Sequence, residues 1–266
     1  MRHATLVFAV AGGRTDLLRA LTPYPFHVTR PFYLDRALPD LATLYLQSTS
    51  GGLYGDDDLL LDIAVGPGAR AMVTTQAATI ARHGRGGTAR MATRIEVAPG
   101  GMLVHAPDPL VMFPGARVAT RTEITLHAGA TLLCIDGFAC HDPGGGRAAF
   151  DRLDARTVVR RPDGRVLLAE AGMIEGDELN GPASPLGPYA AFGSVLLFGT
   201  DTTPADWQAA ADAAGCLAGL SALPNEAGCA LRVLAPDGGR LARGLAGARD
   251  AGFAALFGHA PAPRRK

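Results

Sequence analysis

The chain has 266 residues, and its 25 Lys and Arg side chains balance 25 Asp and Glu side chains. This neutrality argues against a nucleic-acid binder, which usually carries a basic excess, and against electrostatic attachment to anionic lipid. The four cysteines form no Cys-x-x-Cys pair, and no run approaches the roughly 20 apolar residues of a membrane helix, so we expect a reduced, cytoplasmic protein without membrane or nucleic-acid partners.

A pattern of strand, glycine turn and strand occurs three times in the first half of the chain. Residues 62–65, 94–97 and 123–126 alternate between polar and apolar, and each segment leads into a glycine turn and a second apolar segment. The turns recur about every 30 residues, a period typical of stacked supersecondary units. The alternation predicts strands buried on one face. We therefore expect a mainly β fold, a two-layer β-solenoid-like sandwich of stacked hairpins. Three ordinary hairpins of a β-sandwich remain the alternative.

The second half of the chain mixes strands with the only predicted helices. Strands are expected at 155–160, 166–169, 195–198 and 230–234, and helices at 204–214 and 240–256. Residues 1–259 are predicted to form a single domain with these few C-terminal helices. The tail, residues 260–266, holds two prolines and three basic side chains and is expected to be disordered.

Asp56, Asp57 and Asp58 form the densest acidic cluster. Carboxylate oxygens of this kind can hold or pass a divalent cation. A solvated turn, in which the aspartates accept backbone N–H bonds, is the alternative explanation.

Two cysteines and a histidine offer softer metal ligands. Cys134 lies in an apolar strand, where cysteine behaves as a small buried hydrophobe. Cys140 and His141 begin a loop and are the weaker metal candidates, as a transient ligand pair.

No catalytic constellation stands out along the chain. It holds no Gly-x-Ser-x-Gly elbow, no phosphate-binding loop of the Gly-x-x-x-x-Gly-Lys type, and no His-x-x-x-His pair. We therefore predict a protein that is not an enzyme and assign it no catalytic residue and no tightly bound cofactor.

Residues 51–78 carry a family resemblance. The order Gly51-Gly52-Leu53, Gly55-Asp56, Gly68-Ala69 and residues 74–78 (Thr-Thr-Gln-Ala-Ala) resembles the urease accessory protein family UreD, also called UreH. Similar matches extend over most of residues 4–200, including Phe113-Pro114-Gly115-Ala116.

The resemblance implies an all-β accessory protein with C-terminal helices, needed for insertion of nickel into urease. Its expected partners are apo-urease, a helical UreF-like protein and a UreG-like GTPase, between which it would act as a scaffold and a nickel conduit. Nickel would pass through in transit, and weak oxygen donors suit such a passage because thiolates would trap the ion. Asp56–Asp58 together with Thr74, Thr75 and Gln76 are the expected route. A non-catalytic β-sandwich interaction module and a carbohydrate-active β-solenoid remain as alternatives.

Overall fold

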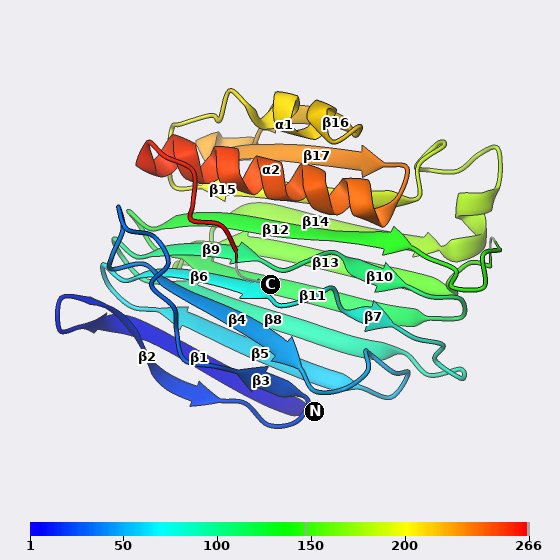
Figure 1. The fold of residues 1–266 in the computed structure, drawn as a ribbon, viewed down its shortest axis with the longest axis horizontal. Helices are drawn as coiled ribbons and strands as arrows, with labels where there is room; N and C mark the ends of the chain where they lie inside the picture. The colour runs from blue at the N-terminus through cyan, green and yellow to red at the C-terminus, as the bar shows by residue number, and fades with distance from the viewer. Residues whose placement is uncertain (147, 265–266) are drawn as a thin grey trace.

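The computed structural model describes residues 1–146 and 148–264 and places two β-sheets face to face, with helices over one of them (Figure 1). The first sheet has the strand order β14-β13-β11-β8-β5-β1-β2. Its strands are β1 (Arg2–Ala11), β2 (Arg14–Leu21), β5 (Asp58–Val65), β8 (Ala89–Val97), β11 (Arg117–Leu126), β13 (Arg152–Arg160) and β14 (Val166–Glu175).

The second sheet has the strand order β16-β17-β15-β12-β9-β6-β4-β3, and β10 and β7 extend it beside β12. Its strands are β3 (Phe26–Val28), β4 (Ala42–Ser48), β6 (Arg70–Thr75), β7 (Ile80–Ala81), β9 (Met102–Ala106), β10 (Leu110–Met112), β12 (Thr131–Cys140), β15 (Ala191–Phe198), β16 (Leu217–Ala222) and β17 (Gly228–Ala235). Two short 3-10 helices, η1 (Gly176–Asn180) and η2 (Pro224–Glu226), lie in the connections.

The repeated glycine turns carry the chain from one sheet to the other. β5, β8 and β11 lie in the first sheet, and the strands that follow them, β6, β9 and β12, lie in the second. Within each sheet the successive strands pair in parallel, so strands one repeat apart form the ladders. The repeating units are therefore solenoid arches. The mainly β, solenoid-like prediction is confirmed, whereas the two strands of each unit do not pair as a hairpin.

Each arch has the same turn geometry. The N–H of Ala69 donates to the carbonyl of Gly66, and Gly68 between them has a φ of +65°. Proline followed by a glycine with positive φ is the signature of a type II turn. The equivalent glycines, Gly100 and Gly129, have φ values of +67° and +70°. The turns stack on one another, since the N–H of Met102 donates to the carbonyl of Ala69 at 2.8 Å.

Two helices cover the outer face of the second sheet. α1 (Trp207–Ala213) and α2 (Gly238–Phe257) bury Trp207, Leu241 and Phe253 against it, each with no accessible surface. Asp237 caps the start of α2, because its side chain accepts the N–H of Arg240 at 2.8 Å. Over the described residues, no helix is both long and apolar enough to cross a membrane.

The C-terminal tail, predicted to be disordered, is described by the structure over residues 260–264. These residues run from the end of α2 across the outer face of the second sheet (Figure 1). Arg264 is anchored there by an ion pair with Asp108, and both side chains are only 12% exposed. Residues 265 and 266, the rest of the predicted tail, lie outside the described residues.

Candidate functional site

A cavity of about 840 Å³ lies between the two sheets. The solenoid arches bring inward-facing side chains from both sheets to its wall, because alternate residues of a strand face the same side. Much of the wall is apolar, and an apolar cavity alone has no means of stabilising an ion. The positions of the polar side chains in the wall therefore decide what the cavity can hold.

Three threonines form a row on the first-sheet wall. Thr93 of β8, Thr122 of β11 and Thr157 of β13 are direct register partners across three parallel strands. All three line the cavity and are half-buried. Thr157 is in turn the register partner of Glu170 on β14. The row of threonine hydroxyls on the first sheet therefore continues to the carboxylate of Glu170.

A second polar row faces the threonines from the second sheet. Asp136 of β12 is the register partner of Ser194 on β15, and Ser194 is that of Arg232 on β17. The side chains of Arg232 and Glu170 form an ion pair between the two sheets. Asp136, Ser194, Arg232, Glu170, Thr157, Thr122 and Thr93 together form what we call the polar belt of the cavity.

Burial shifts the ionisation of the groups in this wall. Asp136 is exposed where it borders the cavity, and desolvation by the protein around the cavity raises the pKa of its carboxyl above the usual range. The N–H of Gly137 donates to the Asp136 carboxylate at 2.7 Å and opposes that shift. Partial desolvation also lowers the pKa of Arg232, whose side chain is 32% exposed. Its ion pair with Glu170 is the contact that compensates for this cost.

A cysteine and a histidine lie beside the belt. Cys134 and His105 are register partners on β12 and β9, and their Sγ and Nδ1 atoms are 3.8 Å apart. Burial raises the pKa of the Cys134 thiol to about 12 and lowers the pKa of His105 to about 4. At neutral pH the thiol therefore keeps its proton, and the imidazole is uncharged.

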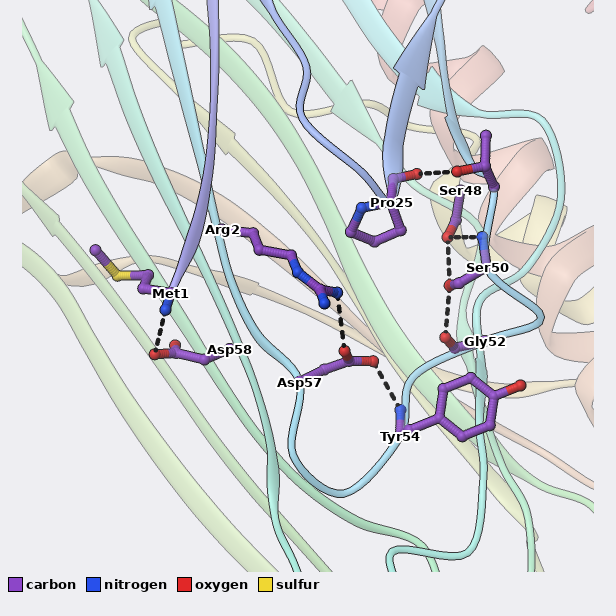
Figure 2. A network of polar contacts seen from close by, with 10 residues as sticks. Met1, Arg2, Pro25, Ser48, Ser50, Gly52, Tyr54, Asp57 and Asp58 are labelled. Carbon is purple, nitrogen blue, oxygen red and sulfur yellow. Dashed lines mark hydrogen bonds and ion pairs between the residues drawn. The ribbon is translucent and has the colours of Figure 1, made fainter.

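The acidic cluster lies at the turn that precedes β5 (Figure 2), between Leu53 and Leu59, which line the cavity. Asp57 accepts the N–H of Tyr54 at 2.9 Å and lies 3.5 Å from a guanidinium nitrogen of Arg2. The Asp58 carboxylate is 3.5 Å from the N-terminal ammonium group. Asp56 is exposed. Two of the three aspartates thus stabilise the turn and the N-terminal strand, and none lines the cavity.

The other predicted route residues divide into two groups. Thr75 and Gln76 line the cavity, at the end of β6. Thr74 does not line it, and its hydroxyl donates to the carbonyl of Ala106 at 2.6 Å. Among the predicted route residues, Thr75 and Gln76 therefore line the cavity, whereas Thr74 and the three aspartates do not.

Cys140 and His141 lie outside the cavity wall. Burial raises the pKa of the Cys140 thiol to about 11, so it too stays protonated at neutral pH. The His141 ring packs 5.5 Å from the ring of Phe113. Within the described part of the chain, no three His, Cys, Asp or Glu side chains converge on a point suited to a metal ion.

Comparison with known proteins identifies the family. The family model described as the UreD urease accessory protein matches residues 2–266. The chain belongs to the UreD family. It is 48% identical over 271 residues to urease accessory protein UreD 1 of Methylorubrum populi, covering 99% of this chain and 91% of that protein.

More distant UreD proteins match over a similar length. The chain is 47% identical over 267 residues to UreD 1 of Bradyrhizobium sp. strain BTAi1, covering 99% of this chain and 94% of the relative. It is 32% identical over 272 residues to UreD 1 of Pseudomonas syringae pv. syringae, covering 100% of this chain and 95% of the relative. The family resemblance drawn from residues 51–78 is therefore confirmed.

The charged residues of the polar belt in this UreD-family chain are not among those predicted from the sequence. Asp136, Glu170 and Arg232 are separated by dozens of residues, and only strand pairing brings them together. A local signal does exist for the first of them. Asp136 follows Leu132 and Cys134 at intervals of two, so the strand pattern places it on the inward face.

Proposed function

We propose that this UreD-family chain assists the insertion of nickel into urease and that its internal cavity forms part of the ion's route. Membership of the family supports a role in urease maturation. The polar belt is the observation that carries the finer proposal, because it lines the cavity between the sheets with oxygen donors.

The chemistry of the belt suits an ion in transit. Threonine and serine hydroxyls are weak, hard ligands, and a conducting path needs sites weak enough to be left again. A thiolate would hold nickel tightly, but the cavity thiol, Cys134, is protonated at neutral pH. An enclosed route also keeps a scarce ion away from bulk water and competing ligands.

The partners in this proposal are apo-urease and accessory proteins of the UreF and UreG types. The chain would act as a scaffold between urease and the nucleotide-hydrolysing partner that delivers nickel. In this proposal it catalyses no reaction itself, and nickel is its cargo. Its place of action would be the cytoplasm, where the four cysteines would stay reduced.

The threonine row provides the test. Changing Thr93, Thr122 and Thr157 together to valine removes three hydroxyl oxygens and keeps side-chain shape. The control is Thr125→Val, on the outward face of β11 between the inward-facing Ile124 and Leu126. Each variant is co-expressed with urease and the other accessory proteins, and nickel per urease active site is measured beside the yield of the accessory complex.

The triple variant should lower the nickel content of urease while the accessory complex still assembles, and the control should match wild type. Normal nickel content in the triple variant would refute the route along the belt. Loss of the complex in the triple variant alone would place these residues in assembly and would equally contradict the proposal.

A further inference from the structure

The second sheet is interrupted at one place, and the cavity reaches this interruption. β12 pairs with β9 as far as Cys134 and with β10 from Phe138 onward, so residues 135–137 have no strand partner on that side within the described residues. The chain between β9 and β10 reads Pro107-Asp108-Pro109. Proline has no N–H to donate to a ladder, so these residues cannot close the gap as a regular strand.

Side chains around the gap belong to the cavity wall. Ala77, Asp108 and Asp136 line the cavity from three different segments. We call this gap the window, bounded by residues 75–79, 107–109 and 135–137. Asp136 belongs both to the window and to the polar belt, so the window adjoins the belt.

The C-terminal segment lies at the outer rim of the window (Figure 1). We call residues 259–264, which follow α2, the strap. Arg264 donates from Nη2 to the carbonyl of Thr75 at 2.7 Å, and its Nη1 lies 3.3 Å from the Asp108 carboxylate. Thr75 and Asp108 both line the cavity, so the strap places its guanidinium on the rim. Farther back, His259 lies 3.7 Å from Asp35.

The strap is attached in a way that permits release. Side-chain contacts hold it, and within the described residues no hydrogen bond joins its backbone N–H groups to the sheet. It begins after Gly258, whose φ is +78° and whose αL conformation ends α2. The Nε of Arg264 is buried without a hydrogen-bond partner. The free-energy cost of its desolvation offsets part of the stabilisation that the other contacts of Arg264 provide.

We propose that the window is a port of the cavity and that the strap is its lid, with Arg264 as the latch. Arg264 neutralises the Asp108 carboxylate at the mouth, and lifting the strap removes the obstruction and lets that carboxylate attract a cation. The role of the port in cation passage rests on the proposed function. The lid itself is tested without nickel or urease.

Cys134 is the reporter for the test, because it lines the cavity and is only 4% exposed. The full chain carries serine at Cys140, Cys216 and Cys229. We would measure the modification rate of Cys134 by two methanethiosulfonates, a cationic aminoethyl reagent and a neutral methyl reagent. One variant ends after Gly258 and lacks the strap. Its matched control ends after Arg264 and keeps the latch.

Loss of the strap should raise both rates by roughly fivefold or more relative to the control, because labelling of a buried thiol follows the population of the form in which it is accessible. Arg264→Gln in the full chain should accelerate the cationic reagent more than the neutral one. Equal rates in the two truncated chains, with both folded by circular dichroism, would overturn the lid. If the shorter chain fails to fold, Arg264→Gln decides, and an unchanged ratio of cationic to neutral rates would overturn the latch.

These outcomes separate the two proposals. Faster labelling without the strap, combined with normal nickel loading in the threonine variants, would retain the lid and refute the nickel route. Unchanged labelling combined with reduced nickel loading would do the reverse.

Discussion

The ion pair between Glu170 and Arg232 should tie the two sheets together across the cavity. The change we consider is Arg232→Met, which keeps an unbranched apolar stem and leaves Glu170 without its counter-charge. The side chains of Glu170 and Arg232 are 37% and 32% exposed, so the pair is intermediate between an exposed and a fully buried ion pair. Exposed pairs contribute about 0–1 kcal/mol, whereas breaking a fully buried pair costs about 3–5 kcal/mol. We expect Arg232→Met to lower the free energy of unfolding by about 1–3 kcal/mol.

A double-mutant cycle with Glu170→Gln isolates the pair. Urea unfolding can be followed by the fluorescence of Trp207, the single tryptophan, which has no accessible surface in the folded chain. The double variant should lose less stability than the sum of the two single variants. The outward-facing pair of Arg94 and Glu123 serves as the control, with a coupling below about 1 kcal/mol. Additivity at Glu170 and Arg232 within about 0.5 kcal/mol would refute the idea that the pair couples the sheets.

Three further predictions follow from burial and hydrogen bonding. Phe253→Ala should lower the free energy of unfolding by about 3–5 kcal/mol, because it creates a cavity in the core between α2 and the second sheet. Urea denaturation measures this loss. Burial lowers the pKa of His105 from 6.5 to about 4, so stability is lost as the pH falls through this window, and His105→Gln should make that loss shallower in acid titrations of unfolding. The double variant Asp56→Asn, Asp57→Asn should leave the yield of the accessory complex and the nickel content of urease near wild type, since asparagine can also cap the turn. A large nickel deficit with an intact complex would instead support a role of the acidic cluster in the nickel route.

The repeated turns show how much of the fold the sequence makes predictable. Proline and glycine at Pro67-Gly68 specify a type II turn, and alternation specifies the strands on either side. Whether those strands pair with each other or with the next repeat depends on contacts about 30 residues apart, which local pattern does not contain. The sequence does not predict β16, because this segment, with Gly219 among alanine and leucine, lacks a clear alternation of polar and apolar residues.

The candidate site was less predictable than the fold. Thr75 and Gln76 were found because they end a strand in a recognisable motif, and they do reach the cavity. The acidic cluster stands out by its density alone, and its carboxylates do not line the cavity, although Leu53 and Leu59 on either side of it do. Asp136 and Arg232 became neighbours of one cavity only through the register of strands far apart in sequence.

Obstruction of the cavity is the most direct test of a nickel route between the two sheets. Ala155 faces the cavity from β13, and Ala155→Phe would place a ring inside it. Ala119 lies on the outward face of β11, between the inward-facing Val118 and Thr120, so Ala119→Phe is the matched control. The measurement is nickel per urease active site after co-expression, for preparations in which the accessory complex forms in equal yield. We expect a marked loss of nickel with Ala155→Phe and wild-type content with Ala119→Phe. Equal nickel content in both variants would contradict a route through the cavity.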